Sequence, residues 1–204
     1  MKRKLLLLLA ALVLFSGSLF ADEKFYQQGD TIFSFNVGPT IPAFIHRWSD
    51  GTFKVGPYTG SDDEEDTGLS VGGIGSINFD YFNTDETSVG FEIGYNFNYD
   101  RSNTIYTNVP IAVLYKYYPI QNGKWDVPLT LGAGLSFNGY DGDVLLSLYG
   151  EAKAGLTYYF NQNWGLGVNA GLTFVPQINY SSDKWADNGL ISYAPITLSL
   201  SYRK

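Results

Sequence analysis

A stretch of unbroken alternation, Ser88–Asp100 (SVGFEIGYNFNYD), constrains the fold more than any other part of the chain. Apolar and aromatic residues occupy every second position. The positions between them hold Ser, Gly and Asn with one carboxylate, Glu92. A period of two is the signature of a β-strand. Large apolar side chains on one face and small polar ones on the other are typical of a strand with lipid outside and a narrow lumen inside.

Seven further segments alternate in the same way. They are residues 31–41, 69–81, 105–118, 125–138, 144–160, 164–174 and 190–202. Compact turns near residues 83–86, 121–123 and 161–163 separate some of them, whereas residues 43–68 and 139–143 are expected to be loops. Eight strands with alternating short and long connections predict an all-β fold, an eight-stranded antiparallel up-and-down transmembrane β-barrel.

The beginning of the chain has the features of a secretory signal peptide. Three basic residues precede an apolar run at 5–15, which is shorter than the ~20 residues that a membrane-spanning helix needs. A small-residue cleavage site follows at Ala21. We therefore expect residues 1–21 to be a cleaved signal peptide and residues 22–204 to form an outer-membrane β-barrel domain. An uncleaved anchor is the alternative.

Composition excludes several classes of function. The chain has 13 Lys and Arg against 20 Asp and Glu, and such an acidic protein is a poor ligand for nucleic acid. It has no Cys, which excludes thiol catalysis and Cys-based zinc sites. No phosphate loop, nucleotide fingerprint or zinc spacing occurs in the sequence, so we expect no cofactor and no metal.

The main alternative fold is a soluble, lipocalin-like barrel with its apolar face inward. Its outer face would be the Gly/Ser/Asn/Thr face, which carries few charges, so the membrane barrel is favoured. Aromatic residues also gather at outward positions near the short turns, where they predict an interfacial girdle. The girdle residues are Tyr81, Tyr115, Tyr117, Trp125, Tyr158, Trp164 and Tyr202.

Three strand sequences carry a resemblance to a known family: VPIAVLYKYYP at 109–119, VPLTLGAGLSF at 127–137 and PITLSLSY at 195–202. Over its whole mature length the chain resembles the small eight-stranded outer-membrane barrels of the outer membrane protein X, outer membrane protein W and OmpA-transmembrane type. The resemblance implies a bacterial outer-membrane location. It also implies partners: outer-membrane lipid and lipopolysaccharide-like lipids, the barrel assembly machinery, and a host or extracellular ligand. Pro110 and Pro128 depart from the pattern, because proline lacks the donor that a strand with two neighbours uses.

Four charged residues fall on the expected lumen face: Glu92, Lys116, Glu151 and Lys153. An eight-stranded barrel has room inside for little more than side chains, and an unpaired buried charge costs several kcal/mol. We therefore expect these residues to form a lumen charge network of Glu–Lys neighbours on different strands. A polar constriction or proton-linked site is the functional alternative to a simple plug.

Two motifs fall in the expected first loop. The acidic run Asp62, Asp63, Glu64, Glu65 and Asp66 is a candidate cation site, because carboxylates bind divalent cations. It lacks the ligand spacing of a dedicated site, and a solvated loop is the alternative. His46, Ser49 and Asp50 carry the residue types of a hydrolytic triad, but such a triad is defined by geometry rather than by proximity in sequence.

The leading hypothesis is a non-enzymatic outer-membrane barrel that works in surface interaction or envelope integrity. A narrow conduit for small hydrophobic solutes is the first alternative, indicated by the W-type resemblance and by the inward apolar residues Ile74, Leu145, Val175 and Ile191. A lipid A-modifying enzyme centred on His46 is the second.

Overall fold

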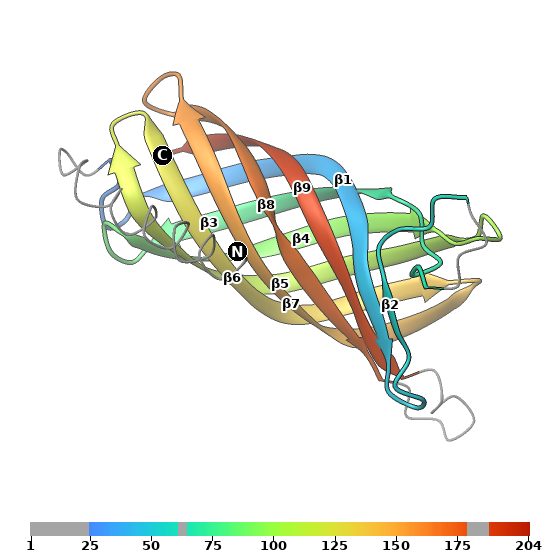
Figure 1. Cartoon of the computed structure of the whole chain (residues 1–204). Helices are drawn as coiled ribbons and strands as arrows, with labels where there is room; N and C mark the ends of the chain where they lie inside the picture. The colour runs from blue at the N-terminus through green and yellow to red at the C-terminus, as the bar shows by residue number, and fades with distance from the viewer. Residues whose placement is uncertain (1–24, 61–64, 179–187) are drawn as a thin grey trace, which may run out of the picture.

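A computed structural model of the chain describes residues 25–60, 65–178 and 188–204. Within these ranges it has nine strands, each antiparallel to its neighbours (Figure 1). None of the described residues form a helix of a length and apolarity that would span a membrane. The strands are β1 (Thr31–Arg47), β2 (Phe53–Val55), β3 (Gly72–Phe82), β4 (Thr87–Tyr99), β5 (Ile105–Asn122), β6 (Trp125–Tyr140), β7 (Asp143–Tyr159), β8 (Trp164–Gln177) and β9 (Gly189–Arg203).

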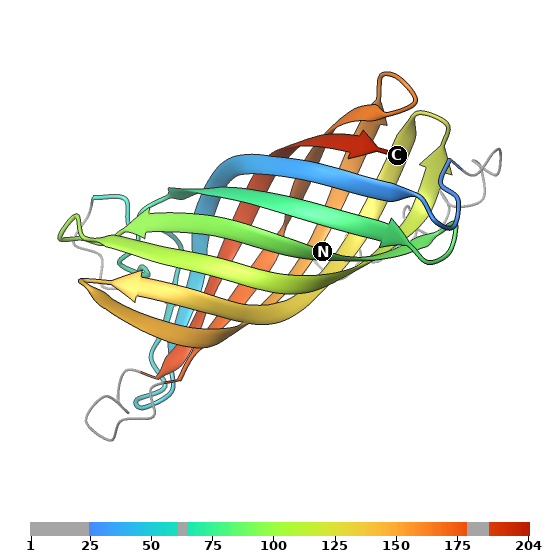
Figure 2. The same ribbon diagram turned by 180° about the vertical axis from the view of Figure 1, so that it is seen from behind.

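Eight of these strands close into a barrel. Each strand from β3 to β8 pairs with the next, β1 pairs with β3, and β9 pairs back with β1, placing Phe33 opposite Tyr202. The two opposite views of Figures 1 and 2 show the closed ring of strands. The short β2 is an additional partner of the distal part of β1. The predicted fold class, an all-β eight-stranded antiparallel barrel, is confirmed.

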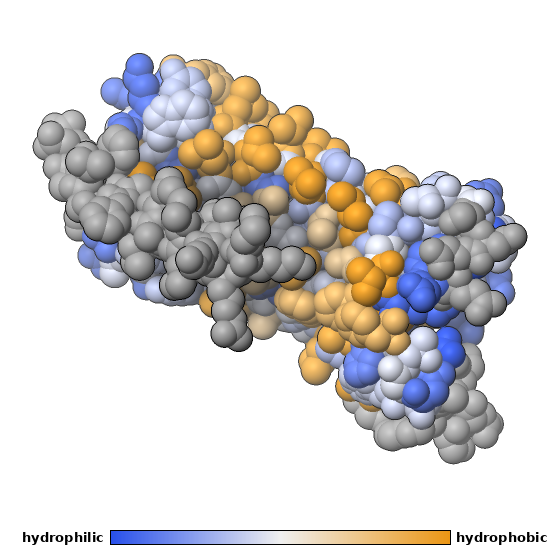
Figure 3. Space-filling model, in the orientation of Figure 1, coloured by the Kyte–Doolittle hydropathy of each residue, from blue (hydrophilic) through white to orange (hydrophobic). Residues whose placement is uncertain are grey.

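The faces of β4 lie as the alternation predicts. Phe91 and Tyr95 point outward and are each 48% exposed, whereas Glu92 between them is 0% exposed. On the face shown in Figure 3, orange, hydrophobic side chains lie over the middle of the barrel and blue, hydrophilic ones lie at both ends. This arrangement is the reverse of a lipocalin-like barrel, which has its apolar face inward.

The distal part of β1 corrects the sequence prediction. Residues 43–47 were expected to belong to a loop, but β1 continues to Arg47 and pairs with β2 on one side and with β9 on the other. The pairing with β9 shifts register between Pro42 and Phe44. This shift breaks the simple alternation, which is why the sequence pattern ended early. Leu69, expected to face outward, is instead buried at 7% exposure, and it precedes β3 with an isolated bridge to Asp100.

The connection between β6 and β7 is also shorter than expected. Residues 139–143 were predicted to be a loop, but the strands extend through most of them and leave a turn at Asp141 and Gly142. Both turn residues have positive φ, 48° for Asp141 and 85° for Gly142. Two positive φ values are what a tight hairpin turn that follows the strand twist requires, and Asp-Gly is a favoured pair for it.

The two strand prolines are accommodated by glycines on neighbouring strands. A Cβ atom at Gly94 would lie 3.1 Å from the Pro110 ring, and one at Gly155 would lie 3.0 Å from the Pro128 ring. The β4–β5 register has no pair at Pro110, and the β6–β7 register has none at Pro128. The ladder is therefore interrupted where proline has no donor, and the missing glycine side chains leave space for the rings.

The barrel has two unlike ends. At the turn end, short connections join β3 to β4, β5 to β6 and β7 to β8, and Lys204 bonds to Thr31 there. At the loop end, β1 is followed by the β2 hairpin and the segment that leads to β3. Toward that end β1, β8 and β9 diverge from β3 to β7 (Figures 1 and 2). The β7–β8 register ends at Gly150 and Phe174, so β7 continues beyond its pairing with β8.

Candidate functional site

A lysine from β7 bridges two glutamates in the lumen. Lys153 Nζ lies 2.9 Å from Glu92 Oε2 and 2.8 Å from Glu151 Oε2. Both carboxylates receive further support, since the Ser76 hydroxyl donates to Glu92 at 3.2 Å and the Tyr149 hydroxyl donates to Glu151 at 2.8 Å. Three of the four residues of the predicted charge network therefore meet directly.

The fourth residue, Lys116, pairs elsewhere. Its Nζ lies 2.7 Å from Asp80 Oδ2 on β3, although β4 runs between their strands. Gly90 on β4 is opposite Asp80, and a Cβ there would lie 2.4 Å from Asp80 Oδ1. The missing side chain therefore leaves room for this carboxylate. The lumen has two separate groups of ion pairs rather than one network, because Lys116 is directly paired with Asp80 and not with a glutamate.

Acidic groups outnumber basic ones in the described part of the barrel interior. The two lysines, Lys116 and Lys153, face four carboxylates: Asp80, Glu92, Asp126 and Glu151. Each of these carboxylates has one buried oxygen without a hydrogen-bond partner in the described protein. The described interior at this level therefore has two more carboxyl groups than lysines.

The lumen is closed at the turn end by a residue that sequence analysis did not single out. Tyr26, which precedes β1, is 0% exposed and belongs to a buried cluster with Ile32, Phe82, Tyr118 and Tyr159. Its ring stacks on Phe82 with 4.2 Å between centroids. No alternating pattern contains Tyr26, so its sequence context gave no signal for this position.

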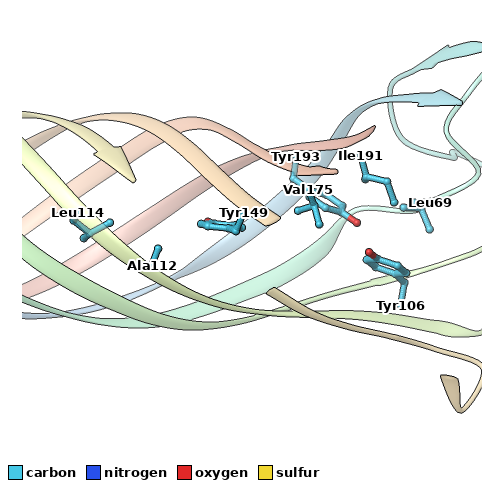
Figure 4. Close-up of a cluster of buried hydrophobic side chains, with 8 residues drawn as sticks. All are labelled: Leu69, Tyr106, Ala112, Leu114, Tyr149, Val175, Ile191 and Tyr193. Carbon is cyan, nitrogen blue, oxygen red and sulfur yellow. The ribbon is translucent and has the colours of Figure 1, made fainter. Parts of the chain in front are cut away.

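A second buried cluster, the upper apolar cluster, fills the lumen toward the loop end. Its side chains follow one another along the barrel interior (Figure 4). The members are Leu69, Tyr106, Ala112, Leu114, Tyr149, Val175, Ile191 and Tyr193. Among the residues expected to line an apolar conduit, Ile74, Val175 and Ile191 are buried, and Leu145 is half-buried.

An open cleft of about 740 Å³ lies above this cluster, at the loop end. Leu69, Ile191 and Tyr106 are shared by the cleft and the upper apolar cluster, and Arg47 and Arg101 also line the cleft. By contrast, the polar cavity inside the lower lumen measures about 40 Å³. The space available to a ligand is therefore at the loop end.

The predicted girdle residues all lie on the outer face near the turn end. Two pairs are in ring contact across neighbouring strands: Trp125 with Tyr158 at 4.7 Å between centroids, and Trp164 with Tyr202 at 4.9 Å. Tyr81, Tyr115 and Tyr117 are 49%, 47% and 41% exposed. This is the geometry that an interfacial belt requires.

The described residues of the two predicted loop motifs make separate contacts. His46 lies in β1 rather than in a loop, with its ring 6.0 Å from the Phe53 ring, and Asp50 pairs with Arg47 at 3.6 Å. Asp62, Asp63 and Glu64 lie outside the described residues. Asp66 pairs with Arg101 at 2.8 Å. The described ranges contain no group of three or more acidic, His or Cys residues arranged to hold a metal ion.

A family model matches residues 18–202. The chain belongs to this family. Its members are uncharacterised, so the match does not assign the chain to the outer membrane protein X or W families. An uncharacterised protein of Treponema pallidum (strain Nichols) is 32% identical over 124 residues, which are 60% of this chain and 56% of the relative. The match thus covers little more than half of that relative's length.

One solved structure of low sequence identity shares the fold. Neisserial surface protein A (NspA) is 12% identical, with a TM-score of 0.56 over 86% of this chain and 97% of that one. Ail, the attachment invasion locus protein of Yersinia pestis, is 11% identical, with a TM-score of 0.47 over 87% of this chain and 100% of that one. The fold comparison rests on NspA.

Proposed function

We propose that this chain is a bacterial outer-membrane β-barrel protein with its strands in the bilayer, its turn end toward the periplasm and its loop end outside. The apolar outer face supports this proposal, because a closed barrel leaves no unpaired strand edge along its paired length and can therefore span lipid. Heat-modifiable gel mobility of the folded protein in detergent tests it. A chain that stays soluble and folded without detergent contradicts it.

Within that setting, we propose a non-enzymatic role in binding at the cell surface or in envelope integrity. The observation that carries it is a lumen filled by side chains beneath an open cleft. Tyr26 closes the turn end, the ion pairs of Lys116 and Lys153 occupy the middle, and the upper apolar cluster follows. A ligand from outside thus meets a cleft with an apolar floor and polar residues at its rim. Host or extracellular molecules and lipopolysaccharide-like lipids are the partners in this proposal.

Conductance separates a binding protein from a pore. In planar bilayers we expect no stable ion current from the purified protein, because no continuous aqueous path follows from this packing. A Lys153→Gly and Tyr26→Gly double variant serves as the positive control, since it removes two of the groups that fill the lumen. Steady single-channel currents from the unaltered protein contradict the proposed closed barrel.

A conduit for small hydrophobic solutes is the second candidate, favoured by the upper apolar cluster below the cleft. The test uses an apolar fluorescent dye. Its binding to vesicles that contain the unaltered protein is compared with its binding to vesicles that contain a Val175→Asp variant. The conduit requires dye transfer into the vesicle that the variant loses. Binding without transfer leaves the cleft as a receptor site.

The lipid-modifying alternative requires that His46→Ala change lipid A composition, and we expect no change.

A further inference from the structure

The closure of the turn end depends on one side chain from a short segment. Tyr26 is buried, but Gln27, Gln28 and Gly29, which follow it, are exposed. Gly29 has a φ of 99°, which turns the chain back toward β1. The segment therefore lies across the barrel mouth and buries the Tyr26 side chain inside it. The half-buried Phe25 ring packs beside it, with its centroid 5.0 Å from that of Tyr26 and 4.8 Å from that of Tyr159.

Few polar contacts hold this side chain. The Tyr26 hydroxyl donates a hydrogen bond to Asp126 and lies 3.0 Å from the Tyr159 hydroxyl. Its backbone amide donates to Gln121 at 3.1 Å. The ring contacts Phe82 and Tyr118, with centroids 4.2 and 5.0 Å away. Arg203 on β9 also lies over the ring, with its guanidinium carbon 5.6 Å from the ring centroid, and it donates a hydrogen bond to the Phe25 carbonyl at 2.7 Å. Because residues 25–30 belong to no strand, the ring can leave without separating any pair of barrel strands.

Behind Tyr26 lies the polar cavity of the lower lumen, lined by Asp80, Lys116, Asp126 and Lys153 among others. At about 40 Å³ it is large enough for a water molecule or a small ion. The cavity lining itself carries two carboxylates and two lysines, and Glu92 and Glu151, both bonded to Lys153, add two further carboxylates beside it. Each of these four carboxylates has one oxygen without a hydrogen-bond partner in the described protein. A space with this balance of charge favours cations over anions.

We propose that Tyr26 is a displaceable stopper that controls the access of small cations to the acidic interior from the turn end. In the closed state the ring fills the mouth and its hydroxyl is bound to Asp126. When the ring leaves, the Asp80 and Asp126 carboxylates face the compartment at that end. Movement of this ring at the turn end is separate from the cleft at the loop end and from the proposed binding role.

Single-cysteine accessibility tests the stopper, because the chain has no cysteine of its own. Thr157 lines the cavity, is 7% exposed and is opposite Asp126 in the β6–β7 register. The modification rate of Thr157→Cys in detergent micelles therefore reports the fraction of molecules with an open mouth. The probes are methanethiosulfonate reagents of similar size that carry either a trimethylammonium or a sulfonate group.

Two variants distinguish a displaceable ring from a fixed one. Tyr26→Phe keeps the ring but loses the hydroxyl bond, so we expect the Thr157→Cys rate to rise about fivefold, as the loss of one net hydrogen bond implies. Tyr26→Ala removes the ring, and we expect a rise on the order of a hundredfold. In both variants the cationic reagent reacts faster than the anionic one. An unchanged rate in Tyr26→Phe, or faster reaction with the sulfonate, overturns the proposal.

A matched control excludes general loosening of the barrel. Ser136 on β6 is 0% exposed but does not line the lower cavity. If a change at Tyr26 opens only the mouth, the modification rate of Ser136→Cys stays constant. An equal rise at both cysteines contradicts a local stopper. Because these measurements use micelles, they do not depend on the proposed bilayer insertion.

Discussion

Lys153 on β7 and Glu92 on β4 form an ion pair of 2.9 Å between strands that are not neighbours in the barrel wall. The same lysine contacts Glu151 at 2.8 Å, so one positive charge serves two buried carboxylates. Removing one partner of a buried pair is far more costly than losing an exposed pair, because the remaining charge stays desolvated. Loss of this lysine therefore leaves two buried carboxylates without their cation, whereas loss of Lys116 leaves one, Asp80.

Replacing Lys153 with Met leaves Glu92 and Glu151 without their shared cation. We expect the free energy of unfolding to fall by roughly 3–5 kcal/mol, the range typical of a broken buried pair. Urea unfolding in lipid vesicles, followed by Trp fluorescence, measures this change. The triple variant Glu92→Gln, Glu151→Gln, Lys153→Met is the control and recovers much of the loss. If Lys153→Met unfolds at the same urea concentration as the original protein, the ion pairs do not stabilise the barrel.

A glycine on the inner face of β6 allows close approach to β5. A Cβ atom at Gly134 would lie 2.0 Å from the Ile111 carbonyl oxygen, whereas one at Gly150 on β7 would come no nearer than 4.0 Å to its neighbours. Because the clash is with backbone, we expect Gly134→Ala to destabilise the barrel by roughly 1–3 kcal/mol. Gly150→Ala is the matched control with little effect. Equal unfolding midpoints for the two variants would show that the wall adjusts freely.

A hydrogen bond outside the barrel core gives a pH-dependent prediction. The Tyr140 hydroxyl donates to Asp100 Oδ2 at 2.6 Å and holds the pKa of the Asp100 carboxyl below its ordinary value. A carboxyl with a lowered pKa stabilises the fold above its unfolded pKa, and this contribution is lost as the pH falls through the folded pKa.

In Tyr140→Phe we therefore expect the pKa of Asp100 to rise toward its ordinary value, so that the β4–β5 connection loosens at a higher pH on acidification. A carboxyl-carbon NMR titration of Asp100 measures the shift. Tyr95→Phe is the control, because Tyr95 lies on the outer face of β4. A titration curve that is the same in Tyr140→Phe and the unaltered protein would show that the hydrogen bond does not set this pKa.

Alternation in the sequence was enough to predict most of the fold. It assigned the faces of β4 because each side chain of a strand must point opposite to its neighbour, whatever the strand pairs with. It failed at Phe44 and His46, where the register shift beyond Pro42 and the short β2 are tertiary features. It failed at Leu69 as well, because this residue follows a turn and lies over the lumen rather than in the wall.

The interior contacts were predictable only in part. Inward positions for Glu92, Glu151 and Lys153 follow from the period of two. The Lys116–Asp80 pair does not, because it depends on the stagger of three strands and on the missing side chain at Gly90. Tyr26 belongs to no strand, and its burial follows only from the three-dimensional position of the barrel mouth.

Lipid contact of the outer face is the central claim, and fluorescence quenching by lipids with brominated tails tests it most directly. Val113 on β5 is 63% exposed on the outer face, and Trp48 follows β1 at the loop end. Two variants that each contain a single Trp are compared in vesicles. In one the Trp is at position 113, through Val113→Trp, and in the other it is the native Trp48. We predict strong quenching at position 113 and little at Trp48. Unquenched fluorescence at position 113, with the folded protein in the aqueous phase, would contradict a membrane-spanning barrel.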